Sequence, residues 1–308
     1  MHYTGDVEDI VSGAWEGHDV EPVALLPGRG ESARGGFIEL AEEGACQLKV
    51  DVALPVLHGQ GGEDGTVQGA LEACGVPYVG CGVLASAVCM DKDAAHRLAA
   101  AAGVRSPLCE VLYRGASDEE CHAAVERCGG FPVFVKPARG GSSIGVSKAS
   151  DEASYRTALE AAFALDEKVA IEEAIQASRW VARSWATRYA ERRWAPSTKS
   201  SSRAMASSAS ISRRILVRIP SCAALRTFPT TCWRACAPQA ARCMRRSAAP
   251  VSRASTFSYA RGEVVFNEVN STPGMTYYSR FPQMMRVAGH ELDEVLAELI
   301  DAELEGVA

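Results

Sequence analysis

Residues 136–143 combine a lysine with glycines and serines in a pattern that suits phosphate binding. Gly140, Gly141, Ser142 and Ser143 offer backbone N–H groups and hydroxyls without bulky side chains, as a flap over phosphates requires. A glycine-rich loop alone is as often a structural turn as a ligand site. Lys136 lies just upstream and adds a fixed cation for phosphate oxygens, so the combination is more specific than the loop by itself.

Glu268 and Asn270 are candidate metal ligands, because they lie two residues apart and share a face if a strand continues through them. A carboxylate and an amide oxygen suit Mg²⁺, a hard cation that is often shared with nucleotide phosphates. The plainer interpretation is a capped strand end, and the two residues alone would favour it. His58, taken alone, is likewise more typical of a loop or core histidine than of a catalytic one.

The elements that must position these residues alternate between strand and helix, which indicates an α/β protein. Apolar runs predict strands that carry Lys136, Glu172, Glu173 and Glu268, at 51–57, 76–79, 131–137, 168–175 and 263–269. Periodic apolar positions and nearby glycine or proline predict helices at 66–74, 91–102, 151–164 and 288–304. Loops are expected at 139–146 and 270–280.

The bulk composition is that of a globular protein of two or three domains, with 308 residues, 47% apolar residues, 23% charged residues and a net charge of −6. No run of 18 apolar residues occurs, so no membrane partner is expected. The first residues lack the basic and apolar regions of a secretory signal. Eleven cysteines without a CxxC pair predict free thiols in a reducing cytoplasm. A metal role for Cys232 and Cys236 is not expected, because no histidine or further paired cysteine lies near them.

Residues 177–260 differ from the rest of the chain. They hold 15 Arg, one Lys and one acidic residue, Glu191, which leaves 16 of the 32 basic and 37 of the 38 acidic residues elsewhere. Arginine with aromatic residues can bind nucleic acid. The block has no RNA-binding motif and interrupts an otherwise ordered series of motifs, so no nucleic-acid partner is expected.

The motifs together resemble the ATP-grasp ligases, and specifically the D-alanine–D-alanine ligase family. The resemblance covers roughly residues 1–176 and 261–308 and is specific, because several long motifs follow one another in the family's order. They are 57–59 with 62–65 and 68–69, then 78–86 with 90–92, then 135–137 with 141–145, and finally 267–270 with 273–276 and 279–280.

The resemblance implies a role for each matching residue. Lys92 and Lys136 would contact ATP phosphates, and Glu172 with Glu173 would meet the adenine and ribose. Ser142 would orient substrate and Ser143 would cover phosphate, while His58 would lie near the first amino acid. Gly274 and Ser279 would contact the second amino acid and the intermediate, with the Gly274 N–H and a family arginine directed at the oxyanion. Glu268 would bridge two Mg²⁺ (or Mn²⁺) ions, and Asn270 would bind one of them.

The implied reaction joins two D-alanines through an acyl phosphate formed from ATP, for peptidoglycan precursor synthesis. The block 177–260 is expected to impair this reaction in the present chain. A homodimer in the cytoplasm is expected from the same resemblance. Residues 278–282 look like the subgroup that contains some resistance-type ligases, and they leave D-alanine, D-serine and D-lactate open as the second substrate.

The implied architecture is an ATP-grasp fold preceded by a Rossmann-like (pre-ATP-grasp) domain. We expect a truncated N-terminal domain at 1–86, a central ATP-grasp subdomain at 87–175 and a C-terminal subdomain at 176–308. The chain starts downstream of the family's first strand and its glycine-rich loop, whose glutamate holds the first D-alanine.

The block 177–260 stands where the family has an adenine-contacting carboxylate, a substrate lid and a strand with a metal-binding aspartate. Family spacing puts that aspartate at Ser255. We interpret the block as a frame-shifted reading of the same gene, because three family-like stretches can be recovered in order by back-translation. One of them places an aspartate codon across Ser255 and Thr256. Alternatives left open are an inactive nucleotide-binding fragment and another carboxylate–amine ATP-grasp ligase.

Overall fold

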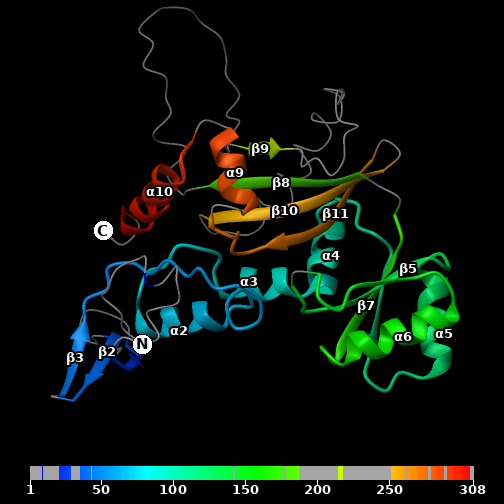
Figure 1. Cartoon of the computed structure of the whole chain (residues 1–308), viewed down its shortest axis with the longest axis horizontal. Coiled ribbons are helices and arrows are strands. Elements are labelled where there is room, and N and C mark those ends of the chain that lie inside the picture. The colour runs from blue at the N-terminus through cyan, green and yellow to red at the C-terminus, as the bar shows by residue number, and fades with distance from the viewer. Residues whose placement is uncertain are drawn as a thin grey trace, which may run out of the picture.

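The computed structural model describes residues 9, 21–28, 35–42, 44–141, 143–175, 178–186, 214–217, 251–260, 263–276, 279–287 and 290–305. These residues form three sheets with helices packed against them (Figure 1). Within the described ranges, no helix is long and apolar enough to span a bilayer.

The N-terminal part holds an antiparallel sheet of order β1-β2-β3 and two helices. Their bounds are β1 (Val23–Leu26), β2 (Gly36–Ala41), β3 (Gly44–Leu48), α2 (Thr66–Cys74) and α3 (Val83–Met90). The predicted helix 66–74 is confirmed residue for residue. It ends because Gly75 adopts a left-handed conformation, with φ of 68°, and its N–H reaches the carbonyls of the last turn.

The strands predicted at 51–57 and 76–79 were wrong in extent. The two segments meet in a single parallel bridge between Ala53 and Tyr78. Pro55 and Pro77 lack the N–H groups that a longer ladder would need. Because α2 lies between the bridged residues in the chain, the pair still forms one short β-α-β step.

The central sheet has the order β4-β7-β5-β6 and is antiparallel throughout. Its elements are β4 (Cys109–Tyr113), α5 (Asp118–Arg127), β5 (Val133–Pro137), β6 (Ser147–Ala149), α6 (Glu152–Phe163) and β7 (Lys168–Glu173). The predictions for β5, α6 and β7 are confirmed with slightly shorter bounds. One face of the sheet packs on α5 and α6 through a core that includes Val133, Val135, Tyr155, Val169 and Ile171. The alternate residues of β5 and β7 therefore point to the opposite face.

The C-terminal sheet has the order β11-β10-β8-β9. Its strands are β8 (Ser178–Ala186), β9 (Arg214–Val217), β10 (Val251–Ala260) and β11 (Glu263–Asn270), followed by α9 (Arg280–Val287) and α10 (Leu292–Glu305). The predicted strand 263–269 is confirmed. The terminal helix starts four residues later than predicted, and α9 was not predicted. Three strands come from the block 177–260, where the sequence showed no convincing period.

Helix α4 (Lys92–Ala101) lies between the central sheet and the C-terminal sheet (Figure 1). Asp91 caps it by accepting a hydrogen bond from Ala94 N at 3.1 Å. The cap agrees with the predicted helix 91–102. Helix α4 thus contacts both sheets, and its side chains can reach the space between them.

Candidate functional site

A cavity of about 240 Å³ lies between the outer face of the central sheet and β11. Most residues predicted to contact ATP or metal line it, although the sequence places them on different elements: Lys92, Lys136, Ser143, Glu172, Glu173 and Glu268. Ser142 lies outside the described residues. The strand pattern explains this convergence, because Lys136 and Glu172 stand on the face of β5 and β7 that the helices leave uncovered.

Lys136 and Glu172 form an ion pair across neighbouring strands. Their side chains are only 12% and 4% exposed, and the Lys136 Nζ also lies 5.9 Å from the centre of the Phe134 ring. The pair engages Glu172 Oε2. The other carboxylate oxygen, Oε1, is buried and has no hydrogen-bond partner among the described residues. It is an acceptor available to a ligand.

Lys92 brings a second ammonium group to the cavity from the first turn of α4. Its Nζ donates to Gly140 O at 2.5 Å, and the residue is 8% exposed. Burial lowers the pKa of Lys92, and Lys136 lowers it further, while the carboxylates of Glu268 and Glu172 act in the opposite direction. The cavity thus holds two ammonium groups among carboxylates, an arrangement in which a bound anionic group could contact either lysine.

The loop between β5 and β6 shapes the rim of the cavity. Gly145 has φ of 71°, and a Cβ there would come within 2.4 Å of Leu165 Cδ1, so a larger residue would strain the turn. Ser143 also has a positive φ, of 60°. The turn places exposed Ser143 and Ile144 over the cavity, as a flap over phosphates would require.

Glu173 differs from Glu172 in that both of its carboxylate oxygens bind protein groups. One oxygen pairs with Arg105 at 3.2 Å, and the other accepts from Leu108 N at 3.1 Å. Glu173 therefore stabilises the segment from Arg105 to Leu108 at the edge of the cavity, while Glu172 has a carboxylate oxygen that can accept from a ligand.

Glu268 and Asn270 both belong to β11, and Glu268 lines the cavity. The pairing of β11 with β10 shifts register just before Glu268, after which Glu268 faces Thr256 and Asn270 faces Ala254 along the backbone. A carboxylate and an amide oxygen on one strand face are suitable donors for Mg²⁺. The pairing strand contributes no acidic residue opposite them.

His58, Gly274 and Ser279 meet in a second group, formed by the loop at 57–65, the segment 271–276 and Ser279. A Cβ on Gly274 would lie 2.6 Å from Ser279 Oγ and 4.0 Å from His58 Nε2. A larger residue at 274 would therefore displace the Ser279 side chain at the point where the two loops meet. Ser279 Oγ also lies 2.7 Å from Thr276 Oγ1.

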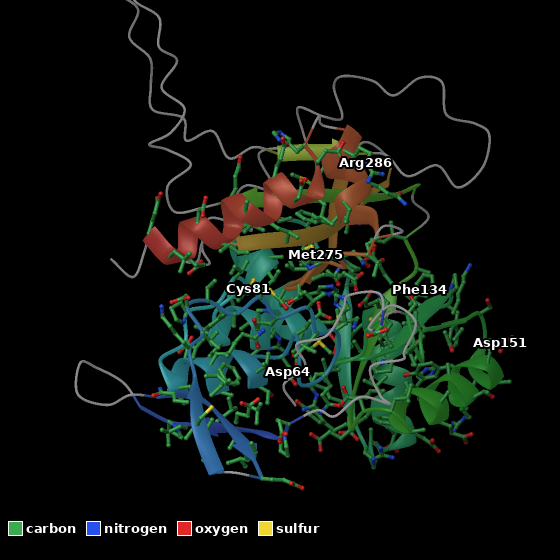
Figure 2. All side chains as sticks on the ribbon, turned by 60° about the vertical axis from the view of Figure 1, so that its left-hand side comes forward. Asp64, Cys81, Phe134, Asp151, Met275 and Arg286 are labelled. Atoms are coloured by element: carbon green, nitrogen blue, oxygen red, sulfur yellow. The ribbon has the colours of Figure 1, made fainter. Side chains whose placement is uncertain are left out.

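Glu63 ties these two loops together, a role that the sequence did not reveal. Its carboxylate accepts from Gly59 N at 2.8 Å and from Thr272 N at 3.3 Å, and Ser271 Oγ donates to its backbone carbonyl at 3.1 Å. Figure 2 shows Met275 beneath the C-terminal sheet, above Cys81 and Asp64 of the N-terminal part. The loop that contains Gly274 and Met275 thus lies between the C-terminal sheet and the N-terminal part.

The sequence analysis also missed a network of ion pairs at the N-terminal end of α4. Lys168 Nζ lies 2.9 Å from both Asp91 and Asp93, and Asp93 pairs in turn with Arg97. The i,i+4 spacing of Asp93 and Arg97 was a readable signal. The long-range partner, Lys168, was not readable from local spacing.

Comparisons with known proteins show which proteins the chain as a whole resembles. A family model described as D-ala D-ala ligase C-terminus matches residues 98–181 and 234–301, and one described as D-ala D-ala ligase N-terminus matches 16–81. D-alanine–D-alanine ligase A of Chromobacterium violaceum is 35% identical over 92% of this chain and 76% of its own length. The structure of the VanG D-Ala:D-Ser ligase from Enterococcus faecalis matches with a TM-score of 0.76 and 29% identity, over 99% of this chain and 85% of that one. The structure of the Bacillus anthracis D-alanine–D-alanine ligase complexed with ATP matches with a TM-score of 0.64 and 26% identity, over 83% and 80%.

Proposed function

Because the chain belongs to the D-alanine–D-alanine ligase family of ATP-dependent ATP-grasp ligases, we propose that it joins two D-alanines to D-alanyl-D-alanine for peptidoglycan precursors. The main support is the cavity beside β11, which brings together Lys92, Lys136 and a Glu172 oxygen that has no hydrogen-bond partner among the described residues. From Glu268 on this strand, the chain continues to Gly274, which lies near His58. The cavity would therefore bind the nucleotide, and the neighbouring group around Gly274 would bind a second substrate.

The nucleotide assignment follows from charge and hydrogen bonding. Glu172 Oε1 accepts from the adenine amino group, and Glu173 borders the ribose. Lys92 and Lys136 neutralise the phosphates, which Ser143 covers together with Ser142. The Glu172–Lys136 pair couples the two ends of the nucleotide site, since one carboxylate serves the base and the phosphate-binding lysine.

Glu268 and Asn270 would hold Mg²⁺ or Mn²⁺, because their oxygen donors suit a hard cation and Glu268 lines the cavity with the two lysines. The ion supplies charge neutralisation for the transferred phosphoryl group. The two oxygen donors and the nucleotide phosphates account for one ion. A second ion, as the family resemblance implies, would depend on further ligands from the nucleotide.

In the first step, a carboxylate oxygen of the first D-alanine attacks the γ-phosphorus, which yields an acyl phosphate and ADP. In the second step, the amine of the other D-alanine attacks the acyl carbon, inorganic phosphate leaves and the amine loses a proton. Gly274 N–H donates to the developing oxyanion and Ser279 orients the second amino acid, while His58 borders the first. Transfer of this kind needs positioning and charge neutralisation more than covalent catalysis. The proposal includes a homodimer acting in the cytoplasm.

Phosphate release from ATP in the presence of Mg²⁺ and D-alanine tests the proposed reaction. We expect release with D-alanine as both substrates, and a loss of at least about 100-fold in Lys136→Met. Lys148→Met, an exposed lysine on β6 of the same sheet, is the matched control and should retain activity.

The result distinguishes the alternatives. ATP binding by calorimetry without phosphate release would indicate an inactive nucleotide-binding fragment. Turnover with D-serine or D-lactate as the second substrate in preference to D-alanine would reassign the substrate. Turnover with none of these, but with another carboxylate and amine, would indicate a different ATP-grasp ligase.

A further inference from the structure

Three side chains from different elements meet beside the nucleotide cavity: His96 from α4, Cys109 from β4 and Glu172 from β7. Each offers a metal-ligand atom, and these atoms all lie within 4.8 Å of one another. The fold brings them together directly, because Cys109 and Glu172 are cross-strand partners and α4 packs against β4. No role in the proposed ligation uses His96 or Cys109.

The His96 ring is oriented as metal-binding histidines are. Its Nε2 lies 2.9 Å from Asn267 O, and the Phe266 ring packs edge-on against it at 5.7 Å. A carbonyl oxygen only accepts, so Nε2 carries the proton of the neutral ring and Nδ1 presents a lone pair. His96 is 4% exposed, and Nδ1 has no hydrogen-bond partner in the part of the chain that the structure describes. A carbonyl on the far nitrogen is the usual support for such a ligand.

Glu172 contributes a second acceptor in the same state. Its Oε1 is buried without a partner in the described ranges, while Oε2 pairs with Lys136. Cys109 Sγ reaches Glu110 O at 3.9 Å, and burial raises the pKa of this thiol. His96 Nδ1 and Glu172 Oε1 are thus buried acceptors that receive no hydrogen bond from the described residues, and Cys109 Sγ lies close to both. A cation bound between them would interact favourably with all three atoms.

We propose that His96, Cys109 and Glu172 form a binding site for a thiophilic divalent cation, with Zn²⁺ the expected ion, and that this ion excludes adenine from Glu172. A tetrahedral zinc shell separates its ligand atoms by roughly 3.3–3.8 Å, so the atoms need to move by about 1 Å or less. A sulfur and a nitrogen ligand select zinc over magnesium, and the site is therefore distinct from Glu268 and Asn270. On binding, the Cys109 thiol loses its proton to solvent and the sulfur donates an electron pair to the metal, whose oxidation state does not change.

The metal site depends only on these three side chains. Its effect on the nucleotide rests on the proposed function, since Glu172 was assigned there to adenine. The two parts can be tested separately: metal binding is measured on the full chain without nucleotide, and nucleotide binding is measured without metal.

Titration with Co²⁺, a coloured substitute for Zn²⁺, tests the site by the thiolate-to-Co²⁺ absorption band. We expect a band that saturates with one ion and disappears when one equivalent of Zn²⁺ is added. Cys109→Ser should abolish the band. His96→Gln retains the thiol and should weaken Co²⁺ binding by at least about 10-fold to 100-fold. Cys121→Ser, a half-buried cysteine on α5, is the matched control and should leave the band unchanged.

A band that persists in Cys109→Ser, or the absence of a band in a wild-type chain with native circular dichroism, would overturn the site. Its effect on the base is tested with adenosine, which lacks metal-chelating phosphates. Zn²⁺ should weaken adenosine binding to the wild-type chain and leave Cys109→Ser unaffected. Equal adenosine affinity with and without Zn²⁺ in the wild type would refute the competition. Failure of adenosine to bind in the absence of metal would instead count against the nucleotide assignment.

Discussion

Replacing Lys168 by methionine should destabilise the protein, because one buried cation serves two carboxylates. The Lys168 Nζ lies 2.9 Å from both Asp91 and Asp93, and the three side chains are only 12%, 20% and 14% exposed. Removing one partner of a fully buried pair costs about 3–5 kcal/mol. Since some solvent reaches this network, we expect the lower end, about 3 kcal/mol, in the free energy of unfolding at neutral pH. Urea unfolding followed by circular dichroism measures it, with Lys148→Met as the exposed control.

The pH dependence of this difference checks the cause. Burial alone would raise the pKa of Asp93, but hydrogen bonds from Arg97 and Lys168 outweigh it and the net pKa is lowered. A lowered carboxyl pKa contributes stability above the ordinary value near 4 and loses it as the pH falls through the folded value. The gap between wild type and Lys168→Met should therefore narrow in acid. A loss below about 1 kcal/mol at neutral pH, equal to that of Lys148→Met, would show that the network acts as a solvated surface pair.

Three further predictions follow from the site. Glu63→Gln presents a donor to Gly59 N or Thr272 N in place of an acceptor. The KM for D-alanine should therefore rise roughly tenfold while ADP affinity stays constant. An equal weakening of D-alanine and ADP binding would mean a general folding defect. Because burial lowers the pKa of Lys92, the ADP affinity of the wild type should fall with rising pH earlier than an ordinary lysine allows, and Lys92→Arg should flatten the profile; calorimetry at a series of pH values would contradict this if both profiles coincide. Resequencing of the gene should reveal a shifted frame over codons 177–261, and an uninterrupted frame that encodes the residues shown would rule out a sequencing error.

Local signals were sufficient to predict α2, α4, α6, α10 and the strands β5, β7 and β11, but not α3, α5 and α9. Gly75 ends α2 as expected, because it tolerates a left-handed conformation. Asp151, the first residue of the predicted helix 151–164, lies outside α6 and caps it by accepting from Ser154 N. In the structure, the alternation of side chains along β5 and β7 places Lys136 and Glu172 on the face of the central sheet that α5 and α6 do not cover. The strands predicted near Ala53 and Tyr78 form only one bridge, because the nearby prolines lack backbone N–H groups. A prediction from apolar runs alone does not take this effect into account.

The contacts that complete the site could not be predicted, because they join distant parts of the chain. The hydrogen bond from Thr272 N to Glu63 spans 209 residues, and that between His96 and Asn267 spans 171. Neither partner has a sequence signature of its own. The family resemblance assigned roles to Glu172 and Lys136. The buried Nδ1 of His96, which lacks a hydrogen-bond partner in the described part of the chain, is revealed only by the packing of three elements.

The block 177–260 affects the chemistry through one strand. The C-terminus family model leaves 182–233 unmatched, wholly inside the block, and its match resumes before β10. Strand β10 occupies the place beside β11, where its backbone pairs Ser255 with Val269 and Thr256 with Glu268. These are the two positions across which the back-translated aspartate codon falls. The sheet therefore retains the strand without an acidic residue beside Glu268. Under the proposed function, nucleotide binding would depend on Lys92, Lys136 and Glu172 and would be separable from turnover that needs a metal ion. For this reason ATP affinity and phosphate release have to be measured independently on this chain.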